Sequence, residues 1–228
     1  MEILFEYDEN EYLPISTISV IGNFNDYNPQ RGKMAKCDNT WKLSYDIEPG
    51  EHRYKFLINN NLKLNDPMAN IYLPDENEEL WSVIMVNDKN ERLYNNTQYT
   101  VHIDKYNITS IINDDLNAVN KKNFNILLDE KVVTRFDFTN VTGLHTVTTA
   151  WYSPRGDLFQ TTENNLFKPT EDDKPIRMWF WMDLKNNTQK YPYGIWKIKL
   201  FIDGEFILED QFNLSEANGY SSKGKILY

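Results

Sequence analysis

The sequence contains little of the material from which most enzyme and metal sites are built. Its 228 residues include one cysteine, Cys37, and three histidines, His52, His102 and His145. A single cysteine forms no internal disulfide and holds no metal alone, and three separated histidines offer little for a zinc site or a histidine-assisted nucleophile. The sequence also lacks phosphate-binding glycine loops, nucleophile elbows and zinc-protease motifs. We therefore predict no catalytic residue, no metal and no cofactor.

Basic residues and long apolar runs are scarce as well. The chain has 24 Lys and Arg residues against 34 Asp and Glu residues, a net charge of −10 that repels phosphate backbones and disfavours nucleic acid as a partner. No apolar stretch approaches the roughly 20 residues that a membrane-spanning helix needs, and residues 1–8 contain no basic leader. We expect a soluble, cytoplasmic protein that does not contact a membrane.

Aromatic residues, by contrast, are abundant, and apolar residues alternate with polar ones along many short segments. An alternation with a period of two, rich in aromatic and β-branched residues, is typical of strands. The chain length suits two domains of about 100 residues each. In the first half, strands are expected over residues 17–21, 41–47, 52–58, 62–64 and 81–85. Their regular spacing, with turns between them, favours a β-sandwich.

The second half has the same all-β character. The polar segment 87–97 is the expected linker, so the predicted domains are residues 1–90 and 97–228. Residues 109–123 are compatible with a short helix or with a loop. Further strands are expected within residues 99–106, 124–138, 145–152, 177–184 and 194–214. The last of these segments resembles the closing hairpin of immunoglobulin-like or fibronectin-type modules, a likeness of architecture alone. The predicted fold is two immunoglobulin-like β-sandwich domains in tandem.

One set of motifs in the first half carries more information than the composition. Gly22-Asn23-Phe24-Asn25-Asp26-Tyr27 is followed by the segment from Pro49 to Phe56, which ends in Tyr54-Lys55-Phe56, and then by Asp66-Pro67. This order resembles the glycogen- and starch-binding modules of branching enzymes, debranching enzymes and the β subunit of AMP-activated protein kinase, which are family 48 carbohydrate-binding modules. The resemblance covers residues 13–88. It implies binding of an α-glucan polysaccharide or malto-oligosaccharide without catalysis.

The same resemblance implies a set of sugar contacts. Tyr27 stands where the family has an aromatic stacking platform, and Lys55 matches a lysine that contacts a sugar hydroxyl. Leu62 aligns with the family's second tryptophan, which is a departure because leucine cannot stack as an aromatic ring does, and Ser82 aligns near a hydrogen-bonding asparagine. Trp81 is a substitute platform, although its alternation with neighbouring apolar residues favours a place in the core.

A second candidate surface lies in the second half. Trp179 and Trp181 fall on one side of an expected strand, about 7 Å apart, while the alternate residues supply the core. Such a pair forms a sugar platform, a patch for a protein partner or for self-association, or a buried pair beneath a loop.

We therefore expect a non-catalytic intracellular protein that binds α-glucan of the glycogen or starch type. The alternative is a scaffold or protein-interaction protein that retains the module's fold with a decayed sugar site. An enzyme with an unrecognised site is a further alternative, which the length of the chain disfavours.

Overall fold

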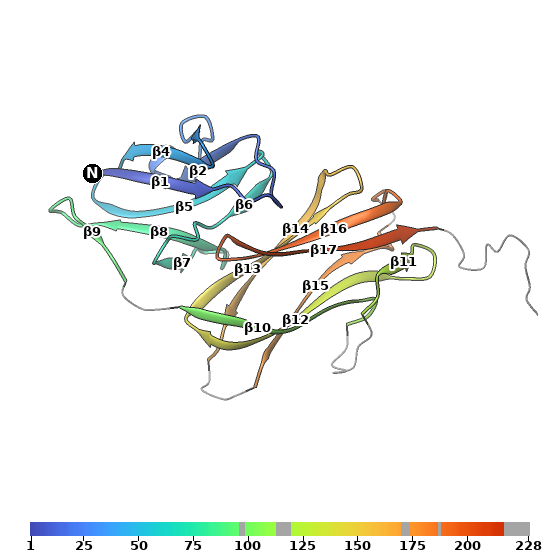
Figure 1. Cartoon of the computed structure of the whole chain (residues 1–228). Coiled ribbons are helices and arrows are strands. Elements are labelled where there is room, and N and C mark those ends of the chain that lie inside the picture. The colour runs from blue at the N-terminus through green and yellow to red at the C-terminus, as the bar shows by residue number, and fades with distance from the viewer. Residues whose placement is uncertain (96–98, 113–119, 170–173, 187, 217–228) are drawn as a thin grey trace, which may run out of the picture.

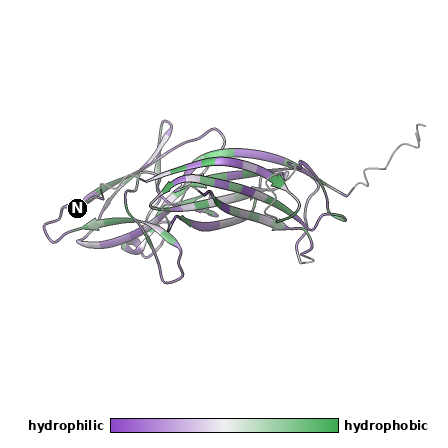
Figure 2. Cartoon of the chain, turned by 90° about the horizontal axis from the view of Figure 1, so that it is seen from below, coloured by the Kyte–Doolittle hydropathy of each residue, from purple (hydrophilic) through white to green (hydrophobic). Residues whose placement is uncertain are grey.

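The protein is an all-β molecule, in a computed structural model that describes residues 1–95, 99–112, 120–169, 174–186 and 188–216. This confirms the predicted fold class. Hydrophobic and hydrophilic residues alternate along the strands (Figure 2), which is why one face of each sheet can meet a core. Within the described residues, the helical content is the short 3-10 helix η1 (Asn23–Asn25), and no helix has the length and apolarity to cross a membrane.

The first half is a sandwich of two small sheets, drawn in blue to green in Figure 1. One sheet has the order β1 (Glu2–Asp8), β4 (Thr40–Asp46), β3 (Ala35–Cys37). The other has the order β2 (Ile18–Gly22), β5 (Gly50–Ile58), β8 (Leu80–Val86), β7 (Tyr72–Pro74), with β6 (Leu62–Leu64) paired to β5 and β9 (Arg92–Leu93) paired to β8. Between the sheets, the rings of Phe5 and Tyr54 have centroids 5.0 Å apart, and those of Tyr7 and Phe56 are 5.1 Å apart.

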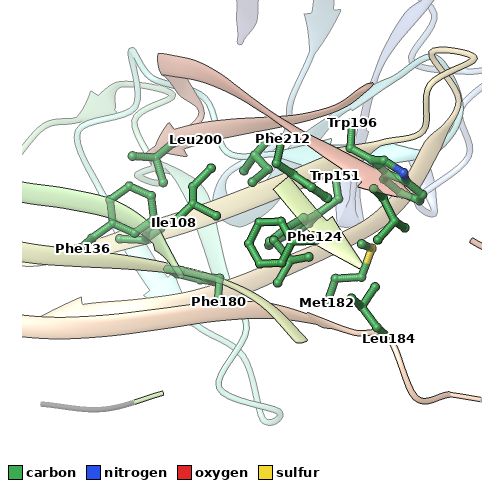
Figure 3. Packing of buried hydrophobic residues seen from close by; sticks show 14 of the residues in the cluster. Ile108, Phe124, Phe136, Trp151, Phe180, Met182, Leu184, Trp196, Leu200 and Phe212 are labelled. Atoms are coloured by element: carbon green, nitrogen blue, oxygen red, sulfur yellow. The ribbon is translucent and has the colours of Figure 1, made fainter. Parts of the chain in front are cut away.

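The second half is a larger sandwich. Its three-stranded sheet has the order β10 (Thr100–Thr109), β12 (Lys131–Thr142), β15 (Ile176–Asp183). Its five-stranded sheet has the order β11 (Asn123–Asn125), β17 (Glu205–Ser215), β16 (Gly194–Ile202), β13 (Leu144–Tyr152), β14 (Leu158–Phe167). Figure 3 shows the core between them, where Phe136 and Phe180 of the smaller sheet lie opposite Trp151, Trp196 and Phe212 of the larger one.

The expected linker needs a correction, and both it and the expected helix or loop fall partly outside the described residues. The segment expected to be a linker begins as a hairpin, because Arg92 of β9 pairs with Val86 of β8 and the Asn87 amide donates to the Glu91 carbonyl. Residues 96–98 of that segment are outside the described residues. The expected helix or loop over 109–123 also lies partly outside them, at residues 113–119.

The two halves pack directly against each other. Phe201 and Ala150 of the second half belong to the buried cluster of the first half, and the ring of Phe206 stacks on Tyr12 with centroids 5.3 Å apart. Gly204 approaches the first half so closely that a Cβ there would lie 1.8 Å from the Asn65 carbonyl oxygen. Among the described strands, each sheet draws on one half alone, and the boundary between two domains stays a prediction.

Candidate functional site

A buried asparagine shapes the loop that follows β2. The Gly22 amide donates to Asn25 Oδ1 at 3.0 Å, and Asn25 Nδ2 donates to the Val20 carbonyl at 2.9 Å. Gly22 has no room for a side chain, since a Cβ would lie 2.6 Å from the Arg53 carbonyl oxygen. The glycine and asparagine of this motif therefore fix the course of the backbone that leads to Tyr27.

Tyr27 is presented to solvent from that loop. Asp26 and Tyr27 have φ values of 57° and 55°, in the left-handed region that bulky residues seldom adopt. The Tyr27 side chain is 47% exposed, and its ring meets Trp81 edge to face with centroids 5.6 Å apart. An exposed aromatic residue held in a strained conformation marks a position where a function is to be sought.

Trp81 is buried, as the sequence favoured, but it lies outside the core cluster of the sandwich. It projects from the outer face of β8 and its indole N–H donates to Asp75 Oδ2 at 3.1 Å. Partial burial raises the pKa of Asp75, but the backbone amides of Asn77 and Glu79 and the Trp81 indole donate to this carboxylate, and the net pKa falls below its ordinary value. This turn fixes the orientation of Trp81 beneath Tyr27.

Lys55 lies on the predicted face of β5, but its ammonium group is not exposed. The side chain is 0% exposed, and Nζ contacts Glu79 Oε1 and Glu163 Oε1, each at 2.8 Å. The ammonium also lies 5.3 Å from the centroid of the Trp81 ring. The expectation of an accessible Lys55 is therefore corrected: strand β14, more than a hundred positions further along the chain, covers it with a carboxylate.

Leu62 and Ser82, which the resemblance aligned with sugar-contacting positions, are both buried in the structure. Leu62 is 1% exposed and packs in the core of the first half, because it pairs with the inward-facing Ile58. Its neighbour Lys63 occupies the outward position. The Ser82 hydroxyl is buried, accepts a hydrogen bond from the Asp66 amide at 2.8 Å and donates to Asn65 Oδ1 at 3.2 Å.

A polar cleft of about 730 Å³ opens beside Lys55, between the two halves. Its lining includes Asn61, Lys63 and Glu79 of the first half and Thr148, Thr161, Glu163 and Asn165 of the second. Burial raises the pKa of the Glu163 carboxyl, an effect that Lys55 partly offsets. Sequence reasoning missed the second-half residues, because polar residues in β13 and in the edge strand β14 carry no local signal of what lies opposite them.

Trp179 and Trp181 project from the outer face of β15. Trp181 is 45% exposed, with the Lys131 ammonium 5.6 Å from its ring centroid, and Trp179 is half-buried. On the neighbouring strand, burial raises the pKa of Asp137, but hydrogen bonds from Arg177 and Arg135 outweigh it and bring the pKa to about 2. The ion pairs of Asp137 with Arg135 and Arg177 therefore border the patch.

The described residues contain no group of three His, Cys, Asp or Glu side chains arranged to hold a metal ion. Residues 171–173, an acidic part of the sequence, are outside the described residues.

Comparison with known families decides what the first half is similar to. Residues 13–92 match the family model described as the glycogen recognition site of AMP-activated protein kinase. The match confirms the resemblance predicted from the motifs at Gly22, Lys55 and Asp66. The first half is therefore similar to a carbohydrate-binding module. No curated protein sequence matches the chain.

The solved structures that match the chain are only distantly similar to it. An immunoglobulin-like protein from Pseudomonas aeruginosa is 14% identical with a TM-score of 0.37, and the match covers 51% of this chain and 97% of that one. A maltogenic amylase from S. marinus is 13% identical with a TM-score of 0.34, covering 93% of this chain and 28% of the amylase. A β-glucosidase from Listeria innocua in complex with glucose is 9% identical with a TM-score of 0.33, covering 55% and 18%. At such scores the likenesses carry no functional information, and the chain spans less than a third of either enzyme.

Proposed function

We propose that the protein binds α-glucan of the glycogen or starch type through its first half, without catalysis, in the cytoplasm. The observation that carries the proposal is the conformation of Tyr27. The backbone of Tyr27 is held in the left-handed region, and its solvent-exposed ring lies edge-on to Trp81, within the matched residues 13–92 and at the position that the resemblance assigns to a stacking platform.

Tyr27 offers what a glucose ring needs. A sugar presents C–H groups on its faces and hydroxyls around its edge, so it binds to an aromatic plane with hydrogen-bonding groups at the rim. Tyr27 supplies such a plane, and its hydroxyl is a hydrogen-bonding group at the rim. With one exposed aromatic platform, worth about 0.5–1.5 kcal/mol beyond its buried area, we expect weak binding.

The environment of the nearby carboxylates supports a non-catalytic role. Glu79 and Glu163 are the acidic side chains closest to Lys55, and both are ion-paired with its ammonium group. This arrangement joins the halves of the molecule and leaves the carboxylates engaged with a fixed cation. The proposed compartment agrees with the exposed free thiol of Cys37, which a reducing environment keeps intact.

Affinity electrophoresis in gels that contain glycogen or amylopectin tests the proposal. We expect the wild type to be retarded and Tyr27→Ala to migrate as it does without glucan, with little change in thermal transition. Tyr94→Ala, which removes another exposed tyrosine ring, is the matched control and keeps the retardation. A wild type whose mobility is the same with and without glucan would show that the site does not bind.

That negative result would favour the alternative, a scaffold that has kept the module's fold. The observation behind this alternative is the exposed Trp181, together with the burial of Lys55 by Glu163. Sedimentation velocity of the wild type and of Trp181→Ala tests it. If the patch mediates self-association, the wild type sediments as a larger species than the variant does.

A further inference from the structure

The polar cleft between the halves has two walls from different parts of the chain. Strand β6, the turn that precedes it and the turn before β8 provide one wall, and strands β13 and β14 provide the other. Lys55 lies at their junction, where its ammonium touches both Glu79 and Glu163 and approaches the Trp81 ring. The cleft and the Tyr27–Trp81 pair therefore lie on the same face of the β2-β5-β8-β7 sheet.

The walls are fixed relative to each other by contacts between the halves. Asn165 Nδ2 donates to the Glu78 carbonyl at 2.8 Å, and Asn65 Nδ2 donates to Thr146 Oγ1 at 3.0 Å. The Lys55–Glu163 pair, with a fully buried ammonium, makes a third link. These contacts hold the two walls in place relative to each other, so binding in the cleft is expected to lose little free energy to ordering the walls.

The groups that line the cleft select a neutral ligand rich in hydroxyls. Amides and hydroxyls such as Asn61, Thr161 and Asn165 both donate and accept hydrogen bonds, which is what sugar hydroxyls require. The carboxylates Glu79 and Glu163 disfavour an anion, and Lys55 is already neutralised by them. The volume of about 730 Å³ lies within the range of pockets that bury a drug-sized ligand, the size of about two or three sugar residues.

We propose that this cleft is a second, oligosaccharide-binding subsite, built jointly by both halves, that takes a short linear stretch of the α-glucan whose neighbouring residues stack on Tyr27. The inference rests on the proposed function and adds a contribution from β14. It makes the second half part of the sugar-binding surface. A linear maltotriose fits between two walls, whereas the wide ring of β-cyclodextrin reaches Tyr27 alone.

Titration calorimetry of the whole chain with maltotriose and with β-cyclodextrin tests the subsite. Thr161→Arg fills the cleft from the second half and is expected to lower maltotriose affinity at least tenfold while leaving β-cyclodextrin affinity within twofold. Thr161→Ser keeps the hydroxyl without the bulk and is expected to bind both ligands as the wild type does. Should Thr161→Arg fold poorly, Asn61→Arg narrows the cleft from the opposite wall and is expected to have the same selective effect.

The results separate the subsite from the proposed function. If glycogen retards the wild type but neither cleft variant loses maltotriose affinity, the subsite is refuted and binding at Tyr27 stands. If the wild type binds neither glycogen nor maltotriose, both are refuted. A loss confined to maltotriose supports the subsite.

Discussion

Tyr27 combines exposure with backbone strain, and the loop around it offsets that strain. A left-handed conformation costs a residue with a side chain about 1–2 kcal/mol. Asn25, fully buried, holds the loop with two hydrogen bonds, and Trp81 supports the ring from one side. The resemblance of the Gly22–Tyr27 motif to glycogen- and starch-binding modules is what singled out Tyr27 in the sequence. The motif contains no signal that Glu163 of the second half covers Lys55.

Leu62 and its exposed neighbour Lys63 are expected to respond differently to a tryptophan side chain. Leu62→Trp forces a larger side chain into a packed core and is expected to lower the free energy of unfolding by about 1–3 kcal/mol without a gain in affinity. Lys63→Trp, on the outward face, is expected to leave stability within about 1 kcal/mol and, because Lys63 lines the cleft, to lower maltotriose affinity as the other cleft-filling variants do. Urea denaturation and calorimetry of both variants check this. A gain in affinity from Leu62→Trp would contradict the observed register.

At the scale of the element, strands were predictable and registers were not. Alternation with a period of two located β5, β8, β13 and β16, because one face of each strand must be apolar. The facing of β6 depends on its pairing with β5, and a slip of one residue reverses every side chain. The β8–β9 hairpin was missed because Asn87 to Asn90 is polar enough to resemble a linker. The contact of β14 with Lys55 depends on tertiary packing that no local pattern encodes.

His145, near the beginning of β13, joins the beginning of β10 and the end of β12 to the β16–β17 turn. Its Nδ1 lies 2.6 Å from Asp203 Oδ2, and its Nε2 lies near the Thr100 and Thr142 carbonyls at 3.1 and 3.0 Å. Burial lowers the pKa of His145, but the hydrogen bond and charge of Asp203 and the two carbonyls raise it above its ordinary value on balance. All these partners are acceptors, which favours the doubly protonated ring.

The sign of the resulting pH effect follows from that shift. Protonated His145 stabilises the folded state. This contribution is complete below the pKa of about 6.5 that the imidazole has in the unfolded chain, and it is lost as pH rises through the higher pKa of His145 in the folded protein. Proton NMR of the three imidazoles is expected to show one that titrates above pH 6.5 and disappears in His145→Asn. The wild type is expected to lose more of its stability advantage over His145→Asn between pH 6 and pH 9 than between pH 5 and pH 6. An imidazole of His145 that titrates below 6.5 would contradict this assignment.

At the scale of the whole molecule, the two sandwiches behave as one packed unit. Phe201 enters the core of the first half, the Tyr7 hydroxyl donates to the Gly204 carbonyl at 3.5 Å, and Lys55 is neutralised across the interface. Composition and chain length predicted two sandwiches but not this contact, since each half has enough apolar residues for a core of its own.

Gly204→Ala tests the importance of the interface. The glycine has a φ of +89° and no room for a Cβ against Asn65, so the variant combines backbone strain with separation of the halves. We expect the free energy of unfolding to fall by about 3 kcal/mol or the single thermal transition to split in two. The control is Gly156→Ala, with a φ of +86° and open space around it, which isolates the strain of about 1 kcal/mol. Equal effects of the two variants would mean that the close approach at Gly204 contributes nothing.

The most direct test of the central claim is an NMR titration of the indole N–H signals with maltoheptaose. The six tryptophans report on separate parts of the molecule. Trp81 lies beneath Tyr27, Trp179 and Trp181 lie on the β15 patch, and Trp151 and Trp196 lie in the core of the second half. We predict that the Trp81 signal shifts in the wild type and stays fixed in Tyr27→Ala, while the signals of Trp151 and Trp196 do not move. A shift of Trp181 with Trp81 unchanged would place the glucan on the second half and contradict the account.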